Sequence, residues 1–223
     1  MNRKFVIGDI HGCSKTFKNL LFETLEITKE DSIYLLGDYI DRGPNSKKVI
    51  DRIIKMKKQG FDINPILGNH ELLLLDSANF VQNHIVWFRN GAKPTLKSFN
   101  INYAHEFKPK YLDFFRNLPY YILLEDYVIV HGGLNFSAAE PLEDKESMVW
   151  IRDSYVDLYK TGGRKLICGH TPTPLDLIKK SLGHDKILLD GGCVYYGRHP
   201  GLGYLVALEL NTIELFFHRN IDM

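Results

Sequence analysis

The sequence is poor in cysteine, carries almost no net charge and contains no long apolar run. Only three of its 223 residues are cysteine: Cys13, Cys168 and Cys193. An odd, low count, with no apolar leader segment after Met1, indicates free thiols in a reducing compartment, so we expect a cytoplasmic protein. We interpret the cysteines as small buried hydrophobes, with oxidation-sensitive inhibition as the alternative.

The charge balance and the short apolar runs exclude two further classes. The chain has 28 Lys and Arg residues and 27 Asp and Glu residues, which gives a formal net charge of +1. No overall electrostatic field therefore attracts it to nucleic acid or to an anionic membrane. The longest apolar runs, such as residues 120–124, are far shorter than the ~20 residues of a membrane span. We therefore expect neither nucleic acid nor a membrane as a partner.

Strand-like runs alternate with helical patterns in the first third of the chain, which predicts a βαβ beginning. Helices are expected from a cap at Ser14 and from Pro44 at a first helical position. Residues 72–126 read as mostly helical with an interruption at residues 90–91, and the closely spaced later strands favour antiparallel pairing. No linker or repeat is evident, so we predict one α/β domain over residues 1–223. The predicted strands are residues 4–7, 32–36, 63–67, 127–130, 165–167, 186–189, 203–210 and 212–218.

Five of these strands are each followed by glycine beside residues that can bind metal or carry charge. In α/β sheets, ligands bind at the carboxyl ends of the strands. Asp, Asn and His are donors that suit Mn, Fe or Zn, while the lack of cysteine in these turns argues against a structural zinc. A single Gly-Asp pair is usually only a turn, but five such turns at strand ends favour a metal site. The turns are GDIHG at 8–12, GDYIDRG at 37–43, GNHE at 68–71, HGG at 131–133 and GHT at 169–171.

The ordered set of these turns resembles the PPP phosphoprotein phosphatases, a branch of the calcineurin-like metallophosphatases. The resemblance covers residues 5 to about 195, and the short length is similar to that of the bacterial and phage members. It implies an α/β fold in which a mixed β-sandwich is flanked by helices (αββα). It also implies two divalent metal ions, with manganese expected first and iron or zinc as alternatives, and attack on phosphorus by a hydroxide that bridges them.

The resemblance implies a ligand set for the two ions. The ligands are Asp9 and His11 for the first ion, Asp38 as the bridge, and Asn69, His131 and His170 for the second.

The resemblance also implies a group of phosphate-binding side chains. Arg42 corresponds to the family's phosphate-binding arginine, and a planar guanidinium can bind two phosphate oxygens at once. Asn69 is expected to contact the phosphate as well as metal. Arg152 is expected to be the second arginine, with Arg164 as the fallback. The alternative for Arg152 is a surface ion pair with Asp153.

For the proton transfer, the resemblance implies that His70 is the general acid and that Asp41 orients and charges its imidazole. The alternative for Asp41 is a turn residue that bonds its own backbone. We interpret Glu71 as an ordinary carboxylate in the first turn of a helix.

Three functions remain open at this point. The motifs favour a serine/threonine protein phosphatase, acting on phosphorylated protein or peptide and with phosphotyrosine left open, because Asp41 and Glu71 are both present. The alternative is a symmetrical diadenosine tetraphosphate hydrolase of the same superfamily. A less favoured alternative is a non-catalytic scaffold that binds phosphoproteins. The loop of the eukaryotic members has no match at residues 190–196, so no eukaryotic-type regulatory subunit is implied. Tyr195 or Tyr196 in that loop would contact substrate or serve packing.

Overall fold

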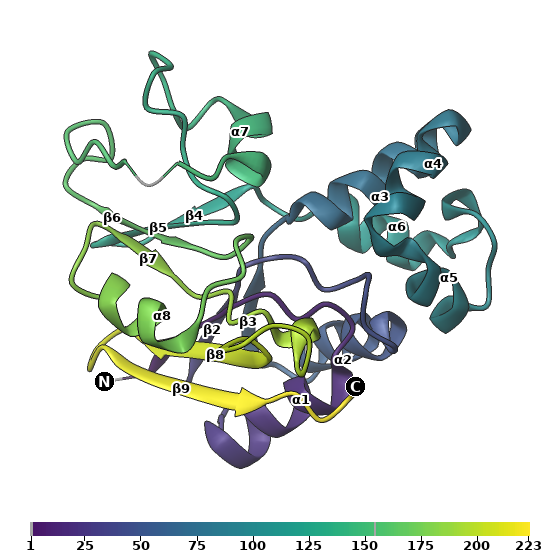
Figure 1. Cartoon of the computed structure of the whole chain (residues 1–223), viewed down its shortest axis with the longest axis horizontal. Helices are drawn as coiled ribbons and strands as arrows, with labels where there is room; N and C mark the ends of the chain where they lie inside the picture. The colour runs from purple at the N-terminus through teal and green to yellow at the C-terminus, as the bar shows by residue number, and fades with distance from the viewer. Residues whose placement is uncertain (1, 154) are drawn as a thin grey trace.

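The computed structural model describes residues 2–153 and 155–223 and contains two β-sheets (Figure 1). One sheet has the strand order β3-β2-β1-β8-β9, and the other has the order β4-β5-β6-β7. Every predicted strand is present, with its ends shifted by no more than two residues. The bounds are β1 Lys4–Ile7, β2 Ser32–Leu35, β3 Asp62–Pro65, β4 Tyr121–Leu123, β5 Tyr127–Val130, β6 Lys165–Cys168, β7 Lys186–Leu188, β8 Tyr204–Glu209 and β9 Glu214–Arg219.

The helices are short and lie around the two sheets (Figure 1). Within residues 2–153 and 155–223, none is long and apolar enough to cross a membrane. The α-helices are α1 Ser14–Asn19, α2 Ser46–Lys58, α3 Asn69–Asn79, α4 His84–Trp87, α5 Lys93–Phe99, α6 Pro109–Arg116, α7 Lys145–Trp150 and α8 Leu175–Ser181, and two π-helical turns are η1 Leu20–Thr24 and η3 Phe88–Ala92.

The second sheet differs from the sequence-based expectation in two respects. Strand β4 lies in the stretch predicted as mostly helical and pairs antiparallel with β5. Strands β5, β6 and β7 are parallel, although the close spacing of the later strands had favoured antiparallel pairing. The reason is that helices α7 and α8 lie in the two connections, and parallel neighbours need such crossovers. Antiparallel pairing is confirmed for the β8–β9 hairpin.

The two sheets pack face to face with helices on their outer sides. Val6 of the first sheet and Ile129 of the second belong to one buried cluster between the sheets. Phe17 of α1 and Ile50 of α2 belong to a second cluster on the other face of the first sheet. Met148 of α7 packs in a third cluster with side chains of β5 and β6. This arrangement confirms the expected α/β sandwich flanked by helices.

Helices α1 and α2 each begin two residues or fewer from the expected place. Ser14 is the first residue of α1 rather than its cap, and Cys13 holds the cap position. The Asp222 carboxylate near the C-terminus accepts hydrogen bonds from the first-turn amides of α1, so no local cap is needed. Pro44 precedes α2, whose N-cap is Asn45, and so is not its first helical residue.

Helices α3 to α6, residues 69–116, form a helical lobe beside the sheets (Figure 1). Trp87, Phe99, Phe107 and Tyr111 pack ring against ring in its interior. The predicted interruption is confirmed, since Gly91 has φ 106° within the η3 turn. The lobe is directly tied to the first sheet, because α3 begins at the end of the loop after β3.

The three cysteines are free and buried, as expected. Cys13 lies near the C-terminal segment, where the Asn220 side-chain amide donates to its sulfur and to the carbonyl of Cys193. The Asn220 side chain therefore joins the Cys13 sulfur at the start of α1 to the main chain of the loop before β8.

Candidate metal and phosphate site

The loops that follow five strands bring all six predicted metal ligands together at one end of the sandwich. Asp9 and His11 follow β1, Asp38 follows β2, and Asn69 follows β3. His131 follows β5 and His170 follows β6, so the second sheet supplies the remaining donors. Each of the six side chains is at most 5% exposed. The strand ends thus build one closed cluster, although its members lie up to 161 residues apart.

The backbone at this cluster is held in unusual conformations. Among the described residues, eight non-glycine residues have positive φ, and five of them are His11, Asp38, Asp41, Arg42 and His170. Such conformations cost of order 1–3 kcal/mol each and persist where the surroundings impose them, often at functional sites. The turns also need glycine, since a Cβ on Gly68 or Gly169 would collide with the carboxylate of Asp38 or Asp9, respectively. The strained backbone of these loops therefore lowers their local stability, and it brings the carboxylates of Asp38 and Asp9 close to the main chain.

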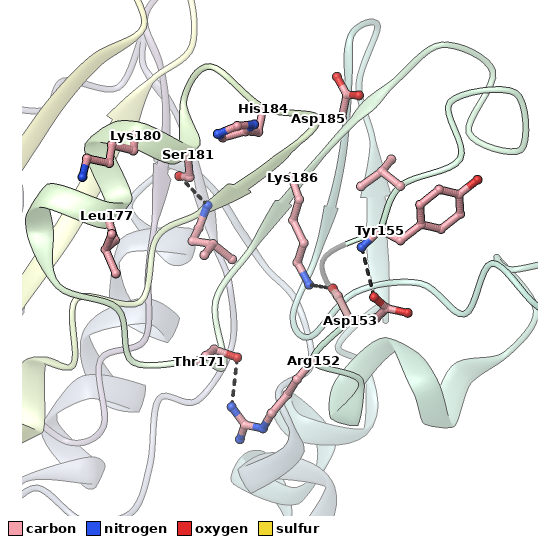
Figure 2. A pocket seen from close by; sticks show the side chains of 12 residues that line it. Arg152, Asp153, Tyr155, Thr171, Leu177, Lys180, Ser181, His184, Asp185 and Lys186 are labelled. Carbon is pink, nitrogen blue, oxygen red and sulfur yellow. Dashed lines mark hydrogen bonds between the residues drawn. The ribbon is translucent and has the colours of Figure 1, made fainter.

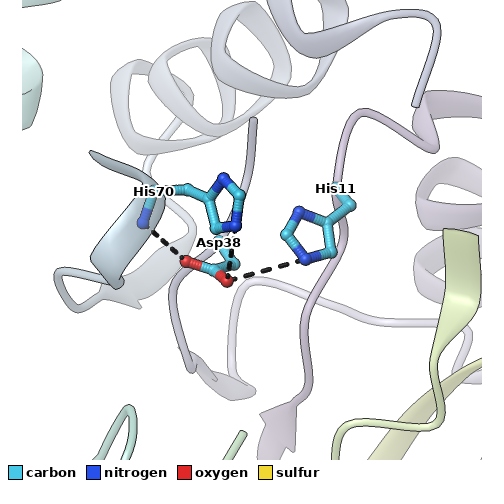
Figure 3. A group of neighbouring side chains, drawn as sticks. All are labelled: His11, Asp38 and His70. Carbon is cyan, nitrogen blue, oxygen red and sulfur yellow. Dashed lines mark hydrogen bonds and ion pairs between the residues drawn. The ribbon is translucent and has the colours of Figure 1, made fainter. Parts of the chain in front are cut away.

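Asp38 lies at the centre of the cluster (Figure 3). Its Oδ2 is 3.5 Å from His11 Nε2, and its Oδ1 is 3.4 Å from His131 Nε2. Two groups of potential metal ligands share this aspartate: His11, Asp38 and His70 form one, and Asp38, His131 and His170 form the other. Within each group the ligand atoms lie within 4.8 Å of one another. One carboxylate in two groups is what a pair of ions with a common bridging ligand requires.

Burial favours the neutral form of the imidazoles of His11, His131 and His170, and main-chain hydrogen bonds orient the rings of His11 and His131. His11 Nδ1 lies 2.8 Å from the Ile40 carbonyl and His131 Nδ1 lies 2.7 Å from the Leu36 carbonyl. A ring that donates Nδ1–H in this way leaves the lone pair of Nε2 for a metal. Burial lowers the pKa of both histidines, and burial together with the His131 ring lowers the pKa of His170 to about 3.

Several polar atoms in the cluster lack the partner that burial demands. Asp9 Oδ1, His70 Nε2 and His170 Nε2 are buried with no hydrogen-bond partner in the described part of the chain. His131 Nε2 faces the amide oxygen of Asn69 at 3.0 Å, so two lone pairs point at each other. Buried acceptors that converge in this way are unfavourable unless a cation lies between them. The donor set therefore fits two divalent ions.

The two carboxylates respond differently to this environment. Burial and the neighbouring carboxylates of Asp190 and Asp38 raise the pKa of Asp9 well above its ordinary value. Burial opposes ionisation of Asp38 as well, but the imidazoles around it, above all that of His131, hold its pKa below the ordinary range. The surroundings thus favour the charged form of the Asp38 carboxylate and disfavour that of Asp9.

Asp41 and His70 form a fully buried pair next to the cluster. His70 Nδ1 lies 2.7 Å from Asp41 Oδ2, which also accepts from the indole N–H of Trp87 at 2.8 Å. The other carboxylate oxygen accepts from the Thr95 hydroxyl at 2.7 Å. Asp41 is therefore more than a turn residue, because the helical lobe holds its carboxylate against the imidazole. The structure also places His70 Nε2, rather than Asp9, in the ligand group of His11 and Asp38.

The two predicted phosphate-binding arginines flank the cluster. The Arg42 guanidinium donates to His11 Nε2 at 2.6 Å. Arg152 donates to the His170 carbonyl at 3.0 Å and to the Thr171 hydroxyl at 2.9 Å (Figure 2). No ion pair joins Arg152 to Asp153 within the described residues. The fallback, Arg164, instead donates to main-chain carbonyls of Leu124 and Thr161.

Comparison with known proteins agrees with this geometry. Residues 3–213 match the family described as calcineurin-like phosphoesterase. The chain belongs to the calcineurin-like phosphoesterases. A symmetrical bis(5'-nucleosyl)-tetraphosphatase of Wigglesworthia glossinidia brevipalpis is 46% identical over 71 residues, which is 32% of this chain and 25% of that relative. The matched part of the chain thus spans about a quarter of the length of that relative.

A longer match and two solved structures extend the comparison. An asymmetrical bis(5'-nucleosyl)-tetraphosphatase, PrpE of Oceanobacillus iheyensis, is 24% identical over 85% of this chain and 84% of its own length. The crystal structure of a putative diadenosine tetraphosphatase superposes with a TM-score of 0.65 at 18% identity, covering 100% of this chain and 95% of that one. A Saccharomyces cerevisiae serine/threonine phosphatase superposes with a TM-score of 0.67 at 15% identity, covering 100% and 81%. Both structures share the fold of this phosphoesterase.

Glu71 has a role in this phosphoesterase that its position in the first turn of α3 did not reveal. Its carboxylate is fully buried and accepts hydrogen bonds from the main-chain amides of Asp38, Tyr39, Ile40 and Gly68. These bonds fix the loop that carries Asp38. The interpretation as an ordinary first-turn carboxylate was therefore incomplete, because three of the four donors lie more than 30 residues away.

Asp190 is a second buried carboxylate of the site that the sequence motifs did not single out. It follows β7, and its Oδ1 accepts the amide N–H of Gly192 at 2.8 Å. Burial raises the pKa of this carboxyl to about 7. Its position, one strand further along the second sheet than His170, is the signal that could have revealed it.

Proposed function

We propose that this phosphoesterase hydrolyses dinucleoside polyphosphates at the carboxylate and histidine cluster. The observation that carries the proposal is that a cavity adjoins each of the two arginines that contact the cluster. Arg152 and Thr171 line a cavity of about 690 Å³, and Arg42 lines one of about 340 Å³ on the side of His11. A dinucleoside polyphosphate has a nucleoside at each end of one phosphate chain, so it suits a centre with a binding space at each of two arginines.

The walls of the larger cavity support this assignment. Figure 2 shows Arg152 and Thr171 near one end of it and Leu177 and Tyr155 further along. Apolar and aromatic side chains suit a nucleoside, while Lys180 and His184 offer polar groups at the wall. The names of the curated relatives, bis(5'-nucleosyl)-tetraphosphatases, point to the same class of substrate.

The chemistry follows from the groups around the cluster. Bound there, two divalent ions would polarise a phosphoryl oxygen and lower the pKa of an attacking water. Arg42 and Arg152 neutralise the oxygens of the phosphate, and an ion at His11 Nε2 would free the Arg42 guanidinium for this contact. Water adds to phosphorus, the bond to the leaving oxygen breaks, and His70 Nε2–H supplies the proton that this oxygen takes up. Asp41 holds the imidazole in the orientation that the transfer needs.

The second candidate is a phosphoprotein phosphatase, and the buried Asp41–His70 pair favours it. A serine or threonine alkoxide is a much stronger base than the phosphate of a leaving nucleotide, so it depends far more on a positioned acid. His70 has one hydrogen bond to the Asp41 carboxylate, which Trp87 and Thr95 hold in place, and such a positioned acid is more than a phosphoanhydride requires. We therefore keep cleavage of phosphothreonine and phosphoserine esters as the competing reading.

Initial rates on two substrates separate the candidates. The manganese-loaded protein is given diadenosine tetraphosphate or a phosphothreonine peptide, and kcat/KM is measured for each, with Asp38→Asn as the control for contaminating phosphatases. We expect preference for the dinucleotide, and chromatography then assigns symmetrical cleavage from two ADP or asymmetrical cleavage from ATP and AMP. Preference for the peptide would reject the dinucleotide reading and support the second candidate. Turnover of neither substrate, with metals bound, would favour a scaffold.

A further inference from the structure

Three arginines from distant parts of the chain line the smaller cavity, which we call the arginine cleft. Arg42 comes from the loop after β2, Arg89 from the η3 turn of the helical lobe, and Arg198 from the loop before β8. No carboxylate lines the cleft, and none of the three guanidiniums forms an ion pair within residues 2–153 and 155–223. Like charges that line one cavity repel one another, and binding of an anion offsets that cost.

The arginine cleft is joined to the metal cluster by direct contacts of Arg42. The amide N–H of Arg42 donates to the carbonyl of Gly91 at 2.9 Å, and a Cβ on Gly91 would lie only 2.8 Å from Arg42 Cγ. This close approach fixes the neighbouring Arg89 relative to the site. On the other side, the guanidinium of Arg42 reaches His11 and also lies 5.9 Å from the centre of the Tyr195 ring. Arg42 therefore stands between the cluster and the other two arginines.

We infer that the arginine cleft is a subsite for phosphates beyond the one that is cleaved, with Arg89 and Arg198 as its recognition residues. A guanidinium binds two oxygens of one phosphate, so Arg42 can serve the reacting phosphate while the outer arginines bind the next groups of the chain. The inference rests on the proposed function and deepens it, because the cleft would select a chain of several phosphates over a monoester. The arginine cleft would bind the phosphates that extend from the cleaved phosphate toward the side of His11.

Binding of two inorganic anions tests the subsite independently of dinucleotide hydrolysis. Calorimetry on the manganese-loaded protein gives the Kd for tripolyphosphate and the Kd for orthophosphate, at a free manganese concentration kept constant. The variants are Arg89→Gln, Arg198→Gln and the double variant. Arg116→Gln, an exposed arginine of α6 outside the cleft, is the matched control. Thermal unfolding confirms that each variant is folded, which is expected because both outer arginines are exposed.

We expect wild-type protein to bind tripolyphosphate more tightly than orthophosphate. Each single variant should raise the Kd for tripolyphosphate by about three- to tenfold. Orthophosphate binding should change less, and Arg116→Gln should leave the ratio of the two constants as in wild type. The inference is overturned if the double variant keeps the wild-type ratio, or if wild type does not prefer tripolyphosphate. If the ratio falls as expected while diadenosine tetraphosphate is not hydrolysed, the subsite stands and only the proposed substrate is rejected.

Discussion

The carboxylate of Asp41 and the imidazole of His70 form a hydrogen bond of 2.7 Å in a place where neither side chain is exposed to solvent. The bond occupies Nδ1 of the ring and directs Nε2 toward Asp38, at 3.9 Å from its Oδ2. Trp87 and Thr95 of the helical lobe saturate the carboxylate. The lobe thus determines the orientation of the one imidazole that is predicted to transfer a proton.

Replacement of His70 by asparagine should lower kcat and leave the metal content unchanged. We expect a loss of about 10²–10⁴ on a phosphothreonine peptide, the range of general acid catalysis, and a smaller loss on diadenosine tetraphosphate, whose leaving group needs the proton less. Steady-state rates and elemental analysis measure the two quantities. Loss of metal in His70→Asn would instead assign His70 as a ligand, in keeping with its place in the His11 and Asp38 group.

Replacement of Asp38 by asparagine should remove metal as well as activity. Its carboxylate is shared by both ligand groups, and asparagine keeps the shape but not the charge. We expect fewer bound ions per chain and a fall in kcat/KM by about 10²–10³, since metal ions contribute several kcal/mol to such reactions. Elemental analysis of the purified variant against wild type checks the first part. Retention of both ions at wild-type affinity would contradict the bridging role.

Removal of metal by a chelator should destabilise the protein. Without cations, burial and the neighbouring carboxylates of Asp190 and Asp38 disfavour the charged form of Asp9, and burial disfavours that of Asp190. With metal at about a hundred times its Kd, linkage contributes about 2.7 kcal/mol, which for a domain of this size corresponds to about 5–10 °C in Tm. Thermal unfolding with EDTA, and again after addition of excess manganese, measures the shift. An equal shift in Asp38→Asn would indicate binding of the ion elsewhere.

Replacement of Glu71 by glutamine should weaken metal binding although Glu71 is not a predicted ligand. Glutamine cannot accept all four amide hydrogen bonds, so the loop that carries Asp38 loses its support. We expect metal affinity to fall by about 10–100-fold, as for other residues that orient metal ligands. Glu146→Gln, an exposed glutamate in the first turn of α7, is the control and should behave as wild type. Equal metal titrations of the two variants would reject the role.

Glu209 is expected to stabilise the C-terminal hairpin in a pH-dependent way. Burial opposes ionisation, but hydrogen bonds from the amide and hydroxyl of Thr212, each 2.6 Å, hold the pKa of Glu209 below its usual range. A lowered pKa in the folded state adds stability above the unfolded pKa of about 4.3, and this stability is lost as the pH falls through the folded pKa.

The variant Glu209→Gln tests this expectation. At pH 7 it should be less stable than wild type by about 1.5–3 kcal/mol, the range for a hydrogen bond to a charged group. The difference in free energy of unfolding should shrink below about pH 4. Glu23→Gln, an exposed glutamate on η1, is the control and should show no such pH dependence. A difference that stays constant from pH 7 to pH 3 would show that the charge is not involved.

Much of the site was predictable because its signals are local. Each predicted ligand lies in the loop after a strand. Strand propensity and glycine turns depend on residues that are adjacent in the sequence, so they can be recognised there. The carboxyl ends of strands in such sheets meet at one edge, so His131 and His170 could be expected near Asp38 before any contact was seen. The role of Glu71 was not predictable in this way, since a first-turn glutamate looks the same whether its carboxylate faces water or a buried loop.

The sequence therefore predicts every strand except β4, the turns that carry the candidate ligands and the family to which the chain belongs. Only the tertiary structure decided that β5 to β7 run parallel, that Glu71 holds the Asp38 loop and that Arg89 and Arg198 meet Arg42 in one cleft. The physical reason is the range of the interactions. Turn and strand preferences act between adjacent residues, whereas burial and charge clustering depend on residues that become neighbours only when the chain is folded.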